Sequence, residues 1–246
     1  MKRFGRQIFL GLLLLVLSIV FYLLHYAIFR DAHHIFIYLA GDIAFVFIEV
    51  LLVTLIIHQI LNQKERRSRL EKLNMVIGAF FSEVGMILLA LFSDFDPRLD
   101  SIRKELVVTN DWSEKEFSKV NKRLKSYDYG VRIRKINLEH LRDFLLEKRD
   151  FLLRLLENPN LLEHEYFTDL LQAVFHLAEE LAKREDVRQL PDTDYEHLAG
   201  DIKRAYTFLV HQGLDYMKHL KDNYPYLFSL AMRTNPFDQN ASVIIK

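Results

Sequence analysis

Two long apolar segments near the N-terminus constrain what this chain can fold into more than any other feature. Residues 8–29 include no charged side chain, and residues 35–61 include only Asp42 and Glu49. Each segment is longer than the roughly 20 residues with which a helix crosses the hydrocarbon core of a bilayer. A cleaved signal peptide has a shorter apolar part than residues 8–29, and it is followed by a small-residue cleavage site, which the first segment lacks. We therefore interpret both segments as membrane spans that remain in the protein.

The charges that flank the two spans predict their orientation. Lys2, Arg3 and Arg6 precede the first span, and the stretch KERRSRLEK after the second has five basic residues against two acidic ones. The connector RDAHH has one charge of each sign. Because positive flanks stay in the cytoplasm, we expect a multi-pass protein of the cell inner membrane with both termini cytoplasmic and the lipid bilayer as a partner.

The composition limits the possible partners, the possible cysteine chemistry and the fold class. Lys+Arg and Asp+Glu are equal at 33 each, so no net charge draws the protein to nucleic acid, and we expect no nucleic-acid partner. The absence of cysteine excludes disulfides, thiolate zinc sites and cysteine nucleophiles. With only 8 Gly and 5 Pro, long helices are the expected material, and we predict an all-α fold.

A third apolar segment, residues 73–92, shows a heptad pattern that packs helices side by side. Its seam has alternating spacings of three and four residues: Leu70, Leu73, Ile77, Phe80, Val84, Ile87 and Leu91. Small residues form a second stripe, at Gly78, Ser82 and Gly85. The segment is either a third span, which would place the rest of the chain outside, or a continuation of the second helix buried in a bundle or an oligomer. We favour the continuation, because the basic stretch before it contains no Pro or Gly.

The remaining chain is expected to be a soluble helical bundle. A helix is expected to begin at Asp96-Pro97, Ser113 and Glu116 have the spacing of a capping box, and Asn137 can cap a helix over 138–157. We predict three domains: a transmembrane hairpin (1–62), a basic and heptad-patterned connecting helix (63–95) and the bundle (96–246).

Later helices are expected at about 162–184, 193–211 and 214–232, with Pro225 kinking the last. Residues 129–136 alternate apolar and basic side chains and could form a short strand. The stretches KLNMVIGAFFSEVG (72–85) and YPYLFSLAMRTNPF (224–237) resemble pieces of an uncharacterised family of prokaryotic membrane proteins with two N-terminal spans and a helical cytoplasmic domain. The resemblance supports this architecture and implies no activity.

Asp42 and Glu49 are the polar candidates within the spans. They are two helical turns apart, on one face with Tyr38, Val46 and Val53, and Glu49 is next to the middle of its span. A charge that faces lipid there costs several kcal/mol, so neither side chain should face lipid. The carboxylates either lock the hairpin or an oligomer, or ring an ion or proton pathway in an oligomer.

Two first-span side chains and a basic segment complete this set of candidates. Tyr22 and His25 lie at a depth from which they could reach Asp42. Residues 115–135 have eight basic side chains and two acidic ones. Either they form a solvated surface or they bind phosphates. The candidates for anion binding are Lys119, Lys122, Arg123, Lys125, Arg132, Arg134 and Lys135.

The histidines do not predict a metal site. At 100° per residue most of them point away from the apolar stripes, so we expect no metal and no cofactor. Glu163, His164 and Asp201 lie nearer the core edges and are expected to form a buried, hydrogen-bonded polar cluster. The sequence has no Gly-x-Ser-x-Gly turn, glycine-rich phosphate loop or His-Glu-x-x-His motif, so no enzymatic activity is expected.

These observations predict a membrane-anchored interaction or sensing protein. It would act through its cytoplasmic domain on an unknown partner and form a homo-oligomer. The alternative is an oligomeric cation or proton conductor that uses Asp42 and Glu49.

Overall fold

The computed structural model describes residues 2–159, 161 and 164–244, and these residues form helices, turns and irregular segments without a strand. The prediction of an all-α fold is therefore confirmed. The chain forms two compact units, residues 1–66 and 67–246, called here the N-terminal and the C-terminal unit. The apolar part of the predicted connecting helix falls within the C-terminal unit.

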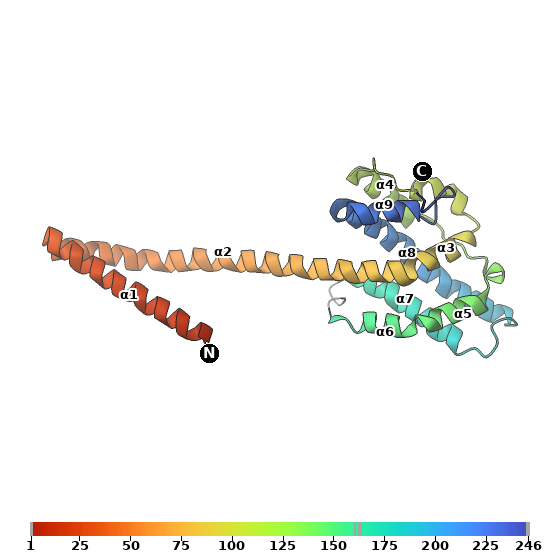
Figure 1. The fold of residues 1–246 in the computed structure, drawn as a ribbon, viewed down its shortest axis with the longest axis horizontal. Coiled ribbons are helices and arrows are strands. Elements are labelled where there is room, and N and C mark those ends of the chain that lie inside the picture. Colours follow the sequence, from red (N-terminus) through yellow and green to blue (C-terminus); the bar gives the residue numbers. More distant parts are fainter. Residues whose placement is uncertain (1, 160, 162–163, 245–246) are drawn as a thin grey trace. The chain divides into compact units, whose positions relative to one another are not determined.

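The N-terminal unit is built from two helices, α1 (Lys2–Phe29) and the first part of α2 (Ala32–Phe80) (Figure 1). At the turn, Arg30 adopts a left-handed φ of 50°, and the carboxylate of Asp31 accepts a hydrogen bond from the backbone N–H of His34 at 3.1 Å. Two segments, Ile8–Phe29 and one within Ala32–Asp94, are long and apolar enough to cross a membrane. No side chain from residue 8 to residue 65 is buried, so this described part of the unit has no core of its own.

The heptad segment belongs to the core of the C-terminal unit. Leu73, Ile77, Phe80 and Val84 are buried, as the seam predicts, whereas Leu70 at its start is 51% exposed. This burial accords with the continuation of the second helix that we favoured over a third span.

The end of the predicted seam is wrong by one residue. Leu88 and Phe92 are fully buried, whereas Ile87 is 48% exposed and Leu91 is only half-buried. The cause is a π-helical turn, η1 (Phe81–Gly85), between α2 and α3 (Met86–Asp94). Since a π-turn adds one residue to the α-helical repeat, every later side chain moves one position round the helix.

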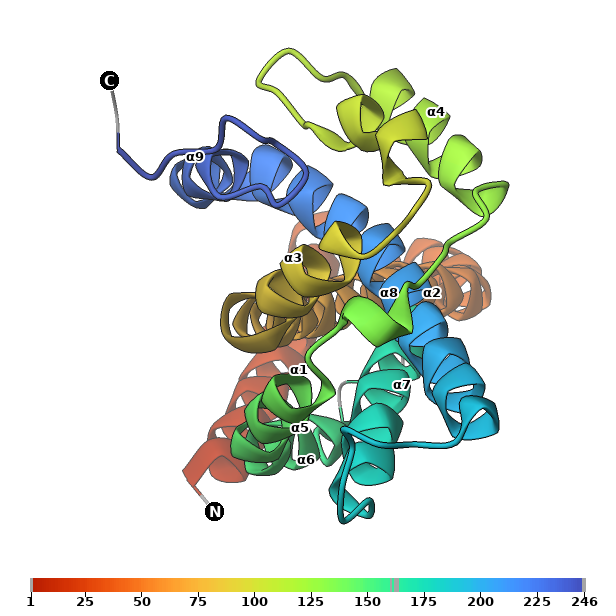
Figure 2. The same ribbon diagram turned by 90° about the vertical axis from the view of Figure 1, so that its right-hand side faces the viewer.

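Helix α8 (Asp192–Asn223) is the central element of the C-terminal unit. It packs against α7 (Glu165–Ala182), α3, α4 (Glu114–Lys125) and α9 (Pro225–Arg233). In Figure 2, α8 crosses the whole unit, with α4 and α9 towards one end and α7 along the other. Helices α5 (Leu138–Glu147) and α6 (Arg149–Leu156) pack on α7. The short 3₁₀ helices are η2 (Leu99–Ser101), η3 (Arg103–Leu106) and η4 (Ile133–Lys135).

Two predicted helix starts are confirmed. Ser113 and Glu116 form the capping box of α4, and the side chain of Asn137 accepts a hydrogen bond from the backbone N–H of His140 at 3.0 Å. The start predicted at Asp96-Pro97 is wrong. There the carboxylate of Asp96 accepts from the backbone N–H of Arg98 at 3.0 Å, and the tight turns η2 and η3 follow instead of an α-helix.

Other boundaries differ because tertiary packing overrides local preference. The helix predicted over 138–157 is divided at Lys148 into α5 and α6. The helices predicted at 193–211 and 214–232 are not separated at Gly213, which lies inside α8. Leu89 packs closely on this glycine, since a Cβ there would be 3.2 Å from a methyl group of Leu89. Pro225 does not kink a helix but begins α9. Residues 129–136 contain η4 instead of the predicted strand.

Candidate anion-binding groove

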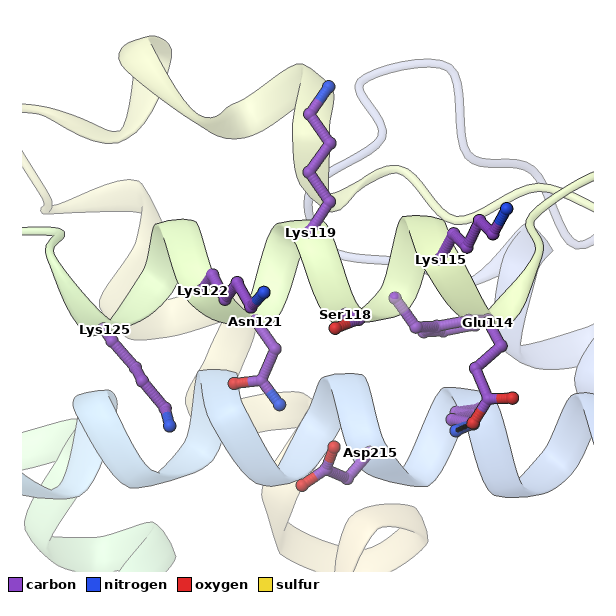
Figure 3. Close-up of a pocket in the computed structure, with 10 residues that line it drawn as sticks. Glu114, Lys115, Ser118, Lys119, Asn121, Lys122, Lys125 and Asp215 are labelled. Atoms are coloured by element: carbon purple, nitrogen blue, oxygen red, sulfur yellow. Dashed lines mark hydrogen bonds and ion pairs between the residues drawn. The ribbon is translucent and has the colours of Figure 1, made fainter.

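Helices α4 and α8 enclose a groove of about 890 Å³ (Figure 3). Phe117, Val120 and Leu124 are the buried residues of α4 and attach it to the core. Because these apolar positions recur every three or four residues, the polar residues between them lie outside the core. The groove is lined by Glu114, Lys115, Phe117, Ser118, Lys119, Asn121, Lys122, Lys125, Asp215 and Lys218.

The groove has an excess of positive charge. Of its five lysines, only Lys218 has an ion-pair partner within the described part of the chain, the carboxylate of Glu114 at 2.8 Å. This hydrogen bond lowers the pKa of Glu114 and raises that of Lys218. In Figure 3, Lys125 points towards α8, whereas Lys115 and Lys119 extend away from it. Since the four groove lysines other than Lys218 have no ion-pair partner among the described residues, their ammonium groups can attract an anion from solution.

On the α8 side, Asp215 and Lys218 line the groove, and His211 lies next to the lining residue Asn121. Asp215 is exposed, but protein atoms crowd its carboxylate, and this partial desolvation raises its pKa against the opposing effect of His164 and Lys218. Nδ1 of His211 lies 3.3 Å from Oδ1 of Asn121. Burial, helped by the charge of Lys125, lowers the pKa of His211, so this ring adds no positive charge at neutral pH.

The structure brings together only part of the predicted anion-binding set. Lys119, Lys122 and Lys125 line the groove, but Arg123 lies at a different depression, with its Nε 3.9 Å from Glu105. The others, Arg132, Arg134 and Lys135, line a third depression.

In that third depression, Arg134 forms an ion pair with Asp192 and lies 4.7 Å above the ring of Tyr195. Sequence reasoning missed Lys115 and Lys218 as groove residues. Lys115 is in the same basic segment, and its helical spacing from Lys119 and Lys122 could have predicted it as a groove residue. Lys218 comes from a distant helix and gave no signal.

Of the predicted polar cluster, the structure describes His164 and Asp201, and these two side chains have different partners. Glu163 lies outside the described residues. His164 caps α7 instead: its Nδ1 accepts a hydrogen bond from the backbone N–H of Phe167 at 3.2 Å.

Asp201 is buried, as expected, but its partners come from elsewhere. Its Oδ2 lies 3.6 Å from Nε2 of His176 and 3.4 Å from Nε2 of His197, and its Oδ1 lies 3.4 Å from Arg204. The contact with His176 ties α7 to α8, whereas His197 and Arg204 belong to α8 itself. Among the described residues, no group of three His, Asp or Glu side chains is arranged to hold a metal ion.

The polar candidates of the two apolar helices also lie apart. Asp42 and Glu49 are exposed, and no hydrogen bond or ion pair reaches either of them within the described chain. Tyr22 is 39% exposed. The ring of His25 contacts Phe29 and His34, with centroids 4.8 and 6.3 Å apart, and makes no described contact with Asp42.

Comparisons with known proteins place the two units in one family. A family model described as the C-terminal helical domain of the uncharacterised protein MJ1433 matches residues 69–233, and a model of the MJ1433 N-terminal helical domain matches residues 2–61. The chain belongs to the MJ1433 family. The uncharacterised protein MJ1433 of Methanocaldococcus jannaschii is 48% identical over 245 residues, which cover 100% of this chain and 97% of that protein.

The descriptions of both family models name helical domains, which agrees with the expected helical architecture, and they name no activity. No solved structure matches the chain. The two matched regions lie on either side of the boundary between Arg66 and Arg67 that separates the compact units. The groove between α4 and α8 lies entirely within the region matched to the C-terminal helical domain.

Proposed function

We propose that this protein is a membrane-anchored sensing or interaction protein whose C-terminal unit binds an anionic ligand in the α4–α8 groove. The observation that carries this proposal is the set of four groove lysines without an ion-pair partner among the described residues, Lys115, Lys119, Lys122 and Lys125. Clefts lined by one sign of charge concentrate ligands of the opposite sign. The ligand would present phosphate or carboxylate groups.

The N-terminal unit supports the membrane part of the proposal. Its apolar side chains from residue 8 to residue 61 are almost all exposed, a surface far larger than a protein keeps in water. A bilayer would cover this surface along two helices of sufficient length. The basic residues on both outer flanks favour the inner membrane with both termini in the cytoplasm.

Binding is favoured over catalysis by the chemistry of the groove. Ser118 is its only hydroxyl group, and no described hydrogen bond joins it to a base that would activate it. The groove also rests on two helices that are fixed by the core, a rigid support suited to recognition. We therefore propose that ligand binding is read by another molecule and not followed by a reaction.

A matched pair of triple variants tests the groove. Calorimetry on the full chain in detergent would use inorganic pyrophosphate and citrate as probes. Lys119→Ala/Lys122→Ala/Lys125→Ala should weaken binding by about 10- to 100-fold, since exposed charge pairs contribute up to about 1 kcal/mol each. The control, Arg132→Ala/Arg134→Ala/Lys135→Ala, removes the same charge elsewhere and should change affinity less than about twofold. Equal losses in both variants, or no binding to the unmodified protein, would refute the proposal.

Unpartnered carboxylates in an apolar helix favour one further candidate, an oligomeric cation or proton conductor. Asp42 and Glu49 are the acidic residues of the second apolar segment, and intramembrane acidic groups commonly mark ion pathways. Proteoliposomes containing the full chain would be tested for ion and proton flux. Glu49→Gln should abolish a flux carried by this carboxylate and leave assembly intact. No flux from the unmodified protein under voltage and pH gradients would count against conduction.

A further inference from the structure

Glu49 needs a partner that the described part of its own chain does not supply. Its side chain is exposed, and no described residue hydrogen-bonds or pairs with it. At about 1.5 Å per residue it lies roughly 21 Å beyond Ile35, where the apolar segment begins, and roughly 18 Å before Leu61, where that segment ends. Both distances are too long for a glutamate side chain to reach either edge of the apolar segment.

The first helix cannot provide this partner at any separation. The two helices are joined at Arg30 and Asp31, so Glu49, about 27 Å from the turn, is level with Leu12 of α1. The stretch of α1 around this level, IFLGLLLLVL (8–17), contains no side-chain hydrogen-bond donor. Asp42 is different, because Ser18 and Tyr22 of α1 lie near its own level.

Neighbours on the same helix do not help either. The residues one turn before and after Glu49 are Phe45, Val46, Leu52 and Val53, and all four are apolar. A lone carboxyl group inside hydrocarbon is costly, and such groups are found paired or facing a bundle interior. The partner must therefore come from outside the chain.

We propose that Glu49 is shared between two copies of this chain, whose α2 helices pack along the face of Asp42, Val46, Glu49, Val53 and Ile56. This face repeats every four and three residues, the spacing of a helix–helix seam. Two copies inserted in the same orientation place identical residues at the same depth. Glu49 then meets Glu49 across a two-fold axis. A protonated carboxyl group of one copy donates its O–H to the carboxylate of the other, so the two share one proton.

This inference rests on the membrane anchoring proposed above and identifies the partner as a second copy. A polar residue within an apolar seam fixes the register and the number of helices, because any sliding would separate the two carboxyl groups. The residues of this seam all belong to the N-terminal unit, and none of them lines the α4–α8 groove.

Single-cysteine crosslinking in native membranes tests the seam, because the chain has no cysteine of its own. Val46→Cys and Val53→Cys flank Glu49, whereas Leu51→Cys and Leu55→Cys lie on the opposite side of α2 at about 100° per residue. The four side chains are similarly exposed, 46%, 47%, 58% and 51%. Oxidation should give a product of twice the monomer mass several-fold more for Val46→Cys and Val53→Cys. Equal yields on both sides, or no crosslinking, would overturn the proposal.

The role of the carboxyl group is tested in the Val46→Cys background. Glu49→Leu should reduce crosslinking several-fold, and Glu49→Gln, which keeps a donor and an acceptor, should retain it. If Glu49→Leu crosslinks as well as its parent, the carboxyl groups do not hold the copies together. Carbonate extraction of the same membranes separates the two levels of failure. Release into the soluble fraction would refute the membrane anchor itself, whereas a retained but uncrosslinked protein would refute only the shared Glu49.

Discussion

Replacing Leu88 with alanine should destabilise the C-terminal unit far more than replacing its neighbour Ile87. Leu88 is fully buried, whereas Ile87 is 48% exposed. A Leu→Ala change at a fully buried site costs about 3–5 kcal/mol, because the lost transfer free energy adds to the cost of the cavity. Ile87→Ala removes a side chain that is already half in water, and should cost less than about 1.5 kcal/mol.

Trp112 makes this comparison measurable in the full chain. It is the only tryptophan, and its ring packs on Phe117 with centroids 5.0 Å apart, so its fluorescence reports unfolding of the C-terminal unit. Urea unfolding in detergent gives the free energy of each variant. For a unit of about 180 residues, Leu88→Ala should lower the melting temperature by roughly 6–20 °C at about 2–4 °C per kcal/mol.

The same experiment can refute the π-turn. An uninterrupted α-helix would keep the heptad seam, with Ile87 and Leu91 at its centre and Leu88 at its edge. If Ile87→Ala costs as much as Leu88→Ala or more, the one-residue shift caused by η1 is wrong. The adjacent pair Leu91→Ala and Phe92→Ala provides an independent repeat, in which the Phe92 variant should be the less stable one.

Two further predictions concern the glycines and the groove. Gly85→Ala should destabilise the protein, because a Cβ there would lie 2.6 Å from the ring of Phe81. Gly200 lies in α8 with open space around it, so Gly200→Ala should stabilise the protein by about 0.5–1 kcal/mol in the same urea assay. The reverse order of stabilities would contradict the packing at η1. Affinity for pyrophosphate should rise as the pH falls through the raised pKa of Asp215, above the ordinary aspartate value of about 3.9, since protonation removes the negative charge from the groove. Asp215→Asn should already bind more tightly at neutral pH and show a flatter pH profile in calorimetry, and an unchanged profile would remove Asp215 from the site.

The groove could be anticipated from the sequence only in part. The basic segment containing Lys119, Lys122 and Lys125 is a local feature, and the capping box at Ser113 fixes the helix that presents it. Its opposite wall, with Asp215 and Lys218, is about 100 residues further along the chain. No local pattern indicates which distant helix packs there, since that choice depends on the fit of whole helices.

The buried residue Asp201 shows the same limit of prediction from sequence. Its position near an apolar stripe predicted burial correctly, because the helical period decides which way a side chain points. Its partner His176 comes from α7, and that pairing exists only because α7 packs along α8.

The sequence by itself determined the all-helical fold, the two apolar helices and the capped start of α4. Each of these follows from the length, period or spacing of residues close together in the chain. Only the tertiary structure decided that the heptad seam shifts at Phe81–Gly85, that α8 runs unbroken through Gly213, and that α4 and α8 face each other across a groove. The physical reason is that each of these features is selected by close packing between distant segments, and packing outweighs the small energy differences between local conformations.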